Sequence, residues 1–128
     1  MIWKIRLGRS IAVRYIRVRL DLRRVPLPSL VDRYSALPPS PRRYQVGTLR
    51  RGVDRLLRLP RRPLRCLPRA LVLYSMVTQQ GHDARLVIGL PLRGESARAH
   101  AWVEIGGVDV GPSPGRDGHD PMAAYPLR

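Results

Sequence analysis

Phenylalanine is absent from this sequence, and cysteine occurs only once in the 128 residues, as Cys66. A lone thiol excludes an intramolecular disulfide and any metal cluster held by several cysteines. It fits a reducing compartment, and we therefore expect a cytoplasmic protein. Aromatic residues make up only 5% of the chain, although 44% of it is hydrophobic. A folded core must then be built mainly from Leu, Val, Ile and Ala.

Long apolar runs are missing as well. No stretch approaches the roughly 18 consecutive apolar residues that indicate a membrane-spanning helix. Lys4, Arg6 and Arg9 interrupt the N-terminal segment where a signal peptide would carry its apolar region. We expect neither a membrane span nor a secretory signal, and the length fits one compact domain.

Acidic residues are scarce in the first half of the chain. Residues 1–65 contain 18 Lys or Arg and 3 Asp or Glu, a net charge of +15. Residues 66–128 contain 6 basic and 6 acidic residues, a net charge of 0. The whole excess lies in the first half, where it could serve an anionic partner such as nucleic acid, a membrane surface or an acidic peptide. A solvated basic face on amphipathic helices is the alternative interpretation.

Hydrophobic periodicity predicts that this basic half is helical. The expected helices cover residues 10–24, 30–37 and 44–59. The first stretch also carries a strand-like alternation, but its length and its lack of internal Gly or Pro favour a helix. Ser29 is expected to cap the second helix, with Asp32 completing a capping box.

The second half of the sequence has a different pattern. A helix is expected over residues 67–80, strands over 84–90, 97–105 and 108–110, and a loop after Gly111. The dipeptide Gly106-Gly107 favours a two-residue hairpin turn. These patterns together predict an α+β protein, with a basic helical region over 1–60 and a core over 61–128 that form one compact unit.

Cys66 occupies a position that activates a thiol. Leu67 precedes Pro68, and Pro68 fits the first turn of a helix, so Cys66 is expected at or just before the helix start. Unpaired N–H groups and the helix dipole favour a thiolate there, and Arg65 and Arg69 add positive charge. This setting indicates a nucleophile; a buried structural cysteine is the alternative.

His100 is the candidate base for that thiol. Along residues 97–105 the side chains alternate, so that His100, Trp102 and Glu104 share one face of a strand. Pairing across the Gly-Gly turn would join Glu104 to Asp109, Trp102 to Gly111 and His100 to Ser113. His82 and His119 follow turn residues and are expected at the surface.

An imidazole base usually has a third group that orients it. Asp109 would lie on the face of His100, about two residue pairs along the ladder, and is the first candidate. Asp117 and Asp120 lie in the loop beyond and are the alternatives.

The chain resembles the transglutaminase-like superfamily in its cysteine at a helix start, its His100-Ala-Trp102-Val-Glu104 strand and its acid on the next strand. A closer resemblance, over about residues 61–111, is to the lasso-peptide leader peptidases, the family of the microcin-processing protein's C-terminal domain. It is carried by Arg65–Leu71, Gly81, Leu86–Gly89 and Ala99–Glu104. The Arg-rich helical first half resembles the stand-alone form of that peptidase.

The resemblance implies a transglutaminase/papain-like core, with a nucleophile helix packed on a small antiparallel sheet. It implies removal of the leader from a ribosomally made lasso precursor, with Cys66 as nucleophile and His100 as base. Its implied partners are the precursor peptide, a small leader-recognition protein and the macrolactam-forming cyclase. The family's acid falls near Gly111-Pro112-Ser113, where this chain has none, so Asp109 is the nearest replacement.

The remaining expectations concern the chemistry around the thiol. The backbone N–H of Cys66 is the expected oxyanion donor, Trp102 and Arg65 are expected to bind substrate, and no metal or organic cofactor is required. The arginines at 50, 51, 55 and 58 are candidates for binding an acidic leader or the recognition protein.

Three other functions compete with the peptidase. A basic nucleic-acid-binding module fits the charge, although no aromatic stacking platform, zinc pattern or recognition helix accompanies it. A transglutaminase or amidase would use the same thioester chemistry on another substrate. A non-catalytic scaffold with a degenerate triad is the third alternative.

Overall fold

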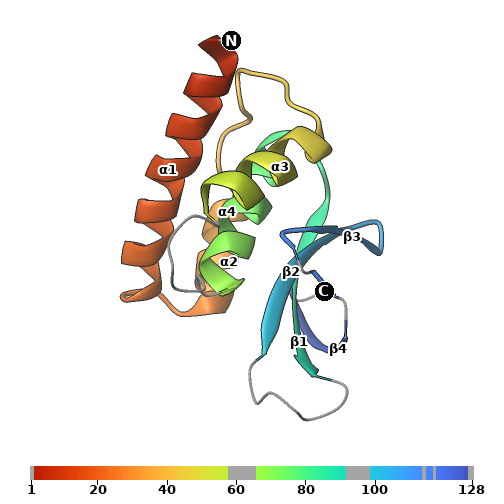
Figure 1. Ribbon diagram of the computed structural model, residues 1–128. Helices are drawn as coiled ribbons and strands as arrows, with labels where there is room; N and C mark the ends of the chain where they lie inside the picture. The colour runs from red at the N-terminus through yellow and green to blue at the C-terminus, as the bar shows by residue number, and fades with distance from the viewer. Residues whose placement is uncertain (1, 58–65, 92–98, 114, 117, 127–128) are drawn as a thin grey trace.

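The computed structural model describes residues 2–57, 66–91, 99–113, 115–116 and 118–126. Helices in the first part of the chain precede a small antiparallel sheet, which lies to one side of them (Figure 1). The helices are α1 (Ile2–Leu22), α2 (Leu27–Ser35), α3 (Val46–Leu56) and α4 (Cys66–Gln79), and the strands are β1 (Ala84–Pro91), β2 (His100–Ile105), β3 (Val108–Gly111) and β4 (His119–Tyr125). The predicted α+β class is confirmed.

The helices of the first half differ from the sequence prediction mainly at their ends. The expected helix over 10–24 starts eight residues earlier, as α1, and none of the helices in the described ranges is long and apolar enough to span a bilayer. The predicted cap at Ser29 is wrong, because α2 begins at Leu27 with Pro26 as its N-cap residue and no side-chain cap hydrogen bond. Pro28 falls in the first turn, where a missing N–H costs no intrahelical bond.

Helix α4 lies at the centre of the molecule. Every residue from Ala70 to Val77 is buried, so this helix is covered around its whole circumference. It packs against α1, α2 and α3 on one side and against β1 and β2 on the other. The hydrophobic core therefore joins the basic half to the sheet, and it fixes the start of α4 relative to β2. The predicted division of the chain near residue 60 stays a prediction.

The sheet has the strand order β3-β2-β1-β4 with antiparallel pairing throughout. The predicted turn between β2 and β3 is confirmed: Gly106 and Gly107 have φ values of +58° and +79°, which suit a two-residue hairpin turn. The predicted pairing of Glu104 with Asp109 is also confirmed.

The hairpin pairing does not continue as predicted beyond Glu104. A register shift between Val103 and Glu104 pairs Gly111 with Val103 instead of Trp102. The predicted pair of His100 with Ser113 is therefore wrong as well, since β3 ends at Gly111. Such a bulge turns the segment after β3 away from the ladder.

The tail of the chain forms β4, which corrects the expectation of a loop after Gly111. Strand β4 pairs with β1 at the edge of the sheet, with Pro121 opposite Gly89 at a second register shift. Proline is tolerated on an edge strand or at a bulge because its missing N–H leaves no ladder bond unmade. This strand places His119 beside the start of β2.

Trp102 and Gly89 pack together on the face of the sheet that carries His100. Trp102 has 0% of its surface exposed. A Cβ added to Gly89 would lie 2.6 Å from the Trp102 ring and 2.7 Å from the Asp120 carbonyl oxygen. The absent side chain at 89 therefore lets the indole and the start of β4 approach β1.

We predict that Gly89→Ala lowers the free energy of unfolding by about 1–3 kcal/mol, because a ring and a backbone carbonyl must both move. Gly47→Ala is the matched control, since its added Cβ meets only the end of the Arg51 side chain, at 3.4 Å. That control should leave stability unchanged or raise it by up to about 1 kcal/mol. Urea unfolding curves of the two variants that coincide would contradict the proposed packing.

Candidate active site

Cys66 and His100 meet in the folded chain. Cys66 is the first residue of α4 and His100 the first residue of β2, and their Sγ and Nδ1 atoms are 2.7 Å apart. Both residues are partly buried. The distance is that of a hydrogen-bonded nucleophile and base. The structure thus brings together the two residues that the sequence singled out.

The surroundings of His100 keep its imidazole neutral. Partial burial lowers the pKa of His100 below its usual 6.5, and the neighbouring His119 lowers this pKa further. A neutral imidazole whose Nδ1 accepts the thiol proton carries its own hydrogen on Nε2. His100 is therefore in the protonation state that a general base needs near neutral pH.

His119 is the neighbour that sequence reasoning missed. Its ring stands edge-on to the His100 ring, with centroids 4.0 Å apart and planes at 83°. The sequence predicted a surface position, and His119 is half-buried at the start of β4. The contact could have been predicted only from β4, which the Gly- and Pro-rich tail concealed.

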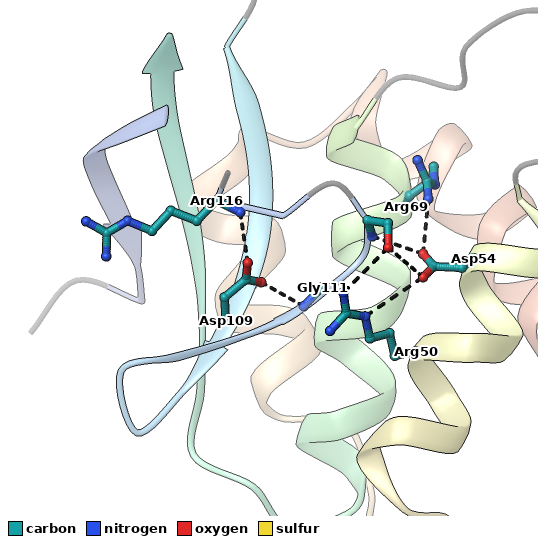
Figure 2. A network of polar contacts seen from close by, with 7 residues as sticks. Arg50, Asp54, Arg69, Asp109, Gly111 and Arg116 are labelled. Carbon is teal, nitrogen blue, oxygen red and sulfur yellow. Dashed lines mark hydrogen bonds and ion pairs between the residues drawn. The ribbon is translucent and has the colours of Figure 1, made fainter. Parts of the chain in front are cut away.

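Asp109 is not hydrogen-bonded to His100. Its Oδ1 accepts the N–H of Gly111 at 2.8 Å, and its Oδ2 accepts the N–H of Arg116 at 2.8 Å (Figure 2). The carboxylate therefore closes the loop that follows β3. Asp120, the second alternative, is exposed, and Asp117 lies outside the described residues. The catalytic role of Asp109 stays a prediction.

The two residues predicted to bind substrate give no support for that role. Trp102 has no exposed surface, and its indole N–H donates to Oε2 of Glu104 at 2.8 Å. The indole therefore supports the strand beside His100, where a substrate could not reach it. Arg65 lies outside the described residues.

Asp54 connects the start of α4 to the segment after β3. Its carboxylate accepts the backbone N–H and the hydroxyl of Ser113, each at 3.0 Å, and pairs with Arg69 at 3.2 Å (Figure 2). Arg50 approaches the same carboxylate at 3.9 Å. Arg69 is one turn from Cys66, so this network holds the nucleophile's turn to α3. Nothing local in the sequence marks Asp54, because its partners are distant in the chain.

We predict that Asp54→Asn lowers the free energy of unfolding by about 2–3 kcal/mol, since an amide offers a donor to Ser113 and removes the charge that pairs with Arg69. The loss should be measured by urea unfolding. Asp32→Asn, at an exposed position of α2, is the control and should change stability by less than about 0.5 kcal/mol. Equal effects of the two substitutions would show that the network does not stabilise the fold.

Comparison with known proteins places the chain in a family. The profile described as the transglutaminase-like superfamily matches residues 11–123, which include both Cys66 and His100. No curated protein and no solved structure gives a significant match. The superfamily includes cysteine peptidases, and its thiol chemistry is of the peptidase or acyl-transfer type, in agreement with the contact between Cys66 and His100. The chain belongs to the transglutaminase-like superfamily.

Proposed function

We propose that this protein is a cysteine peptidase that removes the leader from a ribosomally synthesised lasso precursor peptide. The observation that carries the peptidase assignment is the 2.7 Å contact between Cys66 Sγ and His100 Nδ1 at the start of a buried helix. The substrate class is supported by the resemblance of residues 61–111 to the lasso-peptide leader peptidases.

The mechanism starts with transfer of the thiol proton of Cys66 to Nδ1 of His100. Sγ then attacks the scissile carbonyl carbon, and the resulting oxyanion accepts a hydrogen bond from the backbone N–H of Cys66, one of the unpaired donors at the start of α4. When the C–N bond breaks, His100 gives its proton to the leaving amine, and a thioester remains. His100 next takes a proton from water, which attacks the thioester and releases the acid and the thiol.

His119 is, in this proposal, the group that positions His100. An edge-on ring at 4.0 Å restricts rotation of the base and keeps Nδ1 directed at Sγ. Packing thereby replaces the carboxylate that orients many imidazole bases. Asp109 is less suited to the task, because both of its oxygens already accept backbone N–H groups.

The proposed partners are the precursor peptide, a small leader-recognition protein and the cyclase that closes the macrolactam. The positive charge of the first half supports attraction of an acidic peptide or partner. Part of that charge is structural, since Arg50 packs on Gly111 and approaches Asp54.

We predict that Cys66→Ala lowers cleavage of precursor peptide, incubated with the recognition protein, by at least about 1,000-fold, since the nucleophile is lost. Mass spectrometry of the products checks this and separates hydrolysis, which adds one water, from acyl transfer to an amine. His100→Ala should lower cleavage by a similar factor. Cleavage that survives the Cys66 substitution in a folded protein would rule out a cysteine peptidase.

We predict that His119→Ala lowers kcat/KM by about 10- to 100-fold through misplacement of the base. It should also move the acid limb of the pH profile to higher pH. We expect this limb below pH 6.5 in the wild type, because partial burial and His119 lower the pKa of His100, and removing His119 lets that pKa rise. Cys66 on α4 also contacts His100, and Glu104, four residues along the same strand, accepts the indole N–H of Trp102.

His119→Asn is the matched variant for this test, since an amide keeps the size and polarity of the residue without titrating. It should recover part of kcat/KM while the acid limb stays at the higher pH. A loss of activity with an unmoved limb in both variants would mean that His119 only supports the fold.

A further inference from the structure

Helix α1 presents apolar side chains on two opposite faces. Leu7, Ile11 and Val18 are buried in the core, and with 3.6 residues per turn they fall on one side of the helix. On the other side the described structure leaves five large apolar side chains exposed: Ile2, Ile5, Val13, Ile16 and Leu20. The second stripe lies outside the hydrophobic core, and an exposed apolar stripe of this kind marks a binding surface.

Part of this second stripe borders a groove between α1 and α2 with a volume of about 440 Å³. Val13, Ile16 and Leu20 from α1 and Leu37 beyond α2 supply its apolar walls. A groove of this size fits a short segment of peptide, whereas a folded partner protein needs a larger and flatter contact.

The charge of the groove indicates an acidic occupant. Arg14, Arg17 and Arg33 line it, and the acid among them, Asp21, is already engaged by the Tyr34 hydroxyl at 2.9 Å and by Arg17 at 3.9 Å. Three guanidinium groups against one committed carboxylate leave an excess of positive charge beside the apolar walls.

Arg14 adds a specific donor to this charge. Its Nη2 atom donates to Oε1 of Gln79 at 2.9 Å, whereas its Nη1 atom is buried without a hydrogen-bond partner in the described structure. Burial also lowers the pKa of Arg14 below its ordinary value. A buried unpaired donor of a charged group is costly. A small shift of the Arg14 side chain toward the groove on binding would give this donor a carboxylate partner.

The groove lies far from the thiol. Gln79, which Arg14 contacts, is the last residue of α4, and Cys66 is the first, so roughly 20 Å of helix separates the two sites. An extended chain covers that distance with about six residues. A peptide bound in the groove could therefore place its scissile bond at Cys66.

We propose that the groove between α1 and α2 is an exosite for an acidic, amphipathic segment of the peptide substrate. Apolar side chains of the segment pack on Val13, Ile16 and Leu20, and one carboxylate pairs with Arg14. Its assignment to the substrate rests on the proposed peptidase function, whereas the binding itself does not.

The test uses fluorescence anisotropy with the Cys66→Ala protein, so that cleavage cannot interfere. The probe is a labelled 14-residue peptide, with Leu at helical i, i+3, i+4 and i+7 spacing and Glu elsewhere; its twin carries Lys in place of Glu. The acidic peptide should bind at least tenfold tighter than the basic twin. Ile16→Glu and Arg14→Gln should each weaken binding at least fivefold.

Ile5→Glu is the matched control, because it makes the same change on the same helix but outside the groove. The two side chains are similarly exposed, at 73% for Ile5 and 61% for Ile16. It should leave peptide affinity within twofold of the parent. Equal binding of the two peptides, or equal loss from Ile5→Glu and Ile16→Glu, would overturn the proposal.

Two further measurements separate other occupants. The first is co-sedimentation with vesicles of anionic phospholipid. If the protein binds these vesicles and shows no preference for the acidic peptide, the stripe binds a membrane surface and the exosite proposal is overturned. A dimer in sedimentation velocity that Ile16→Glu dissociates would assign it to a second copy, with the same consequence. Acidic-peptide binding by a protein that cleaves no precursor would contradict the proposed function and leave the groove's specificity intact.

Discussion

The candidate site depends on one constraint, which is the contact between the first turn of α4 and the first residue of β2. Because α4 is covered by three helices on one side and by the sheet on the other, its position has little freedom. Its N-terminal residue is Cys66, and the strand packed on it starts with His100. The rigid packing of a buried helix thus sets a distance that must hold to within a fraction of an ångström for proton transfer.

Asp54 extends this constraint into the basic half of the chain. Through Ser113 and Arg69 it ties α3 to the segment after β3 and to the turn that carries Cys66. The first half therefore helps to build the site and is more than an appended charged region. Arg50 and Arg69 belong to this network and are structural. The arginines that line the groove between α1 and α2, Arg14 among them, are the part of the positive charge left for a binding role.

The sequence predicted the features that depend on neighbouring residues. Pro68 marked the start of α4, Gly106-Gly107 marked the turn, and alternation placed His100 and Trp102 on one face. Features that depend on distant residues were missed. The register shift at Val103 and the edge strand β4, with Pro121 inside it, are set by tertiary pairing. For the same reason the contacts of His119 with His100 and of Asp54 with Ser113 have no local signal.

The two imidazoles at this site have a chemical consequence. A carboxylate beside His100 would stabilise the imidazolium and raise its pKa, whereas burial and His119 lower it. In the proposed mechanism this neutral base takes the proton of the Cys66 thiol before Sγ attacks. On the proposed function, the groove roughly 20 Å from Cys66 holds an acidic segment of the substrate and so helps to position the scissile bond, through contacts separate from Cys66 and His100.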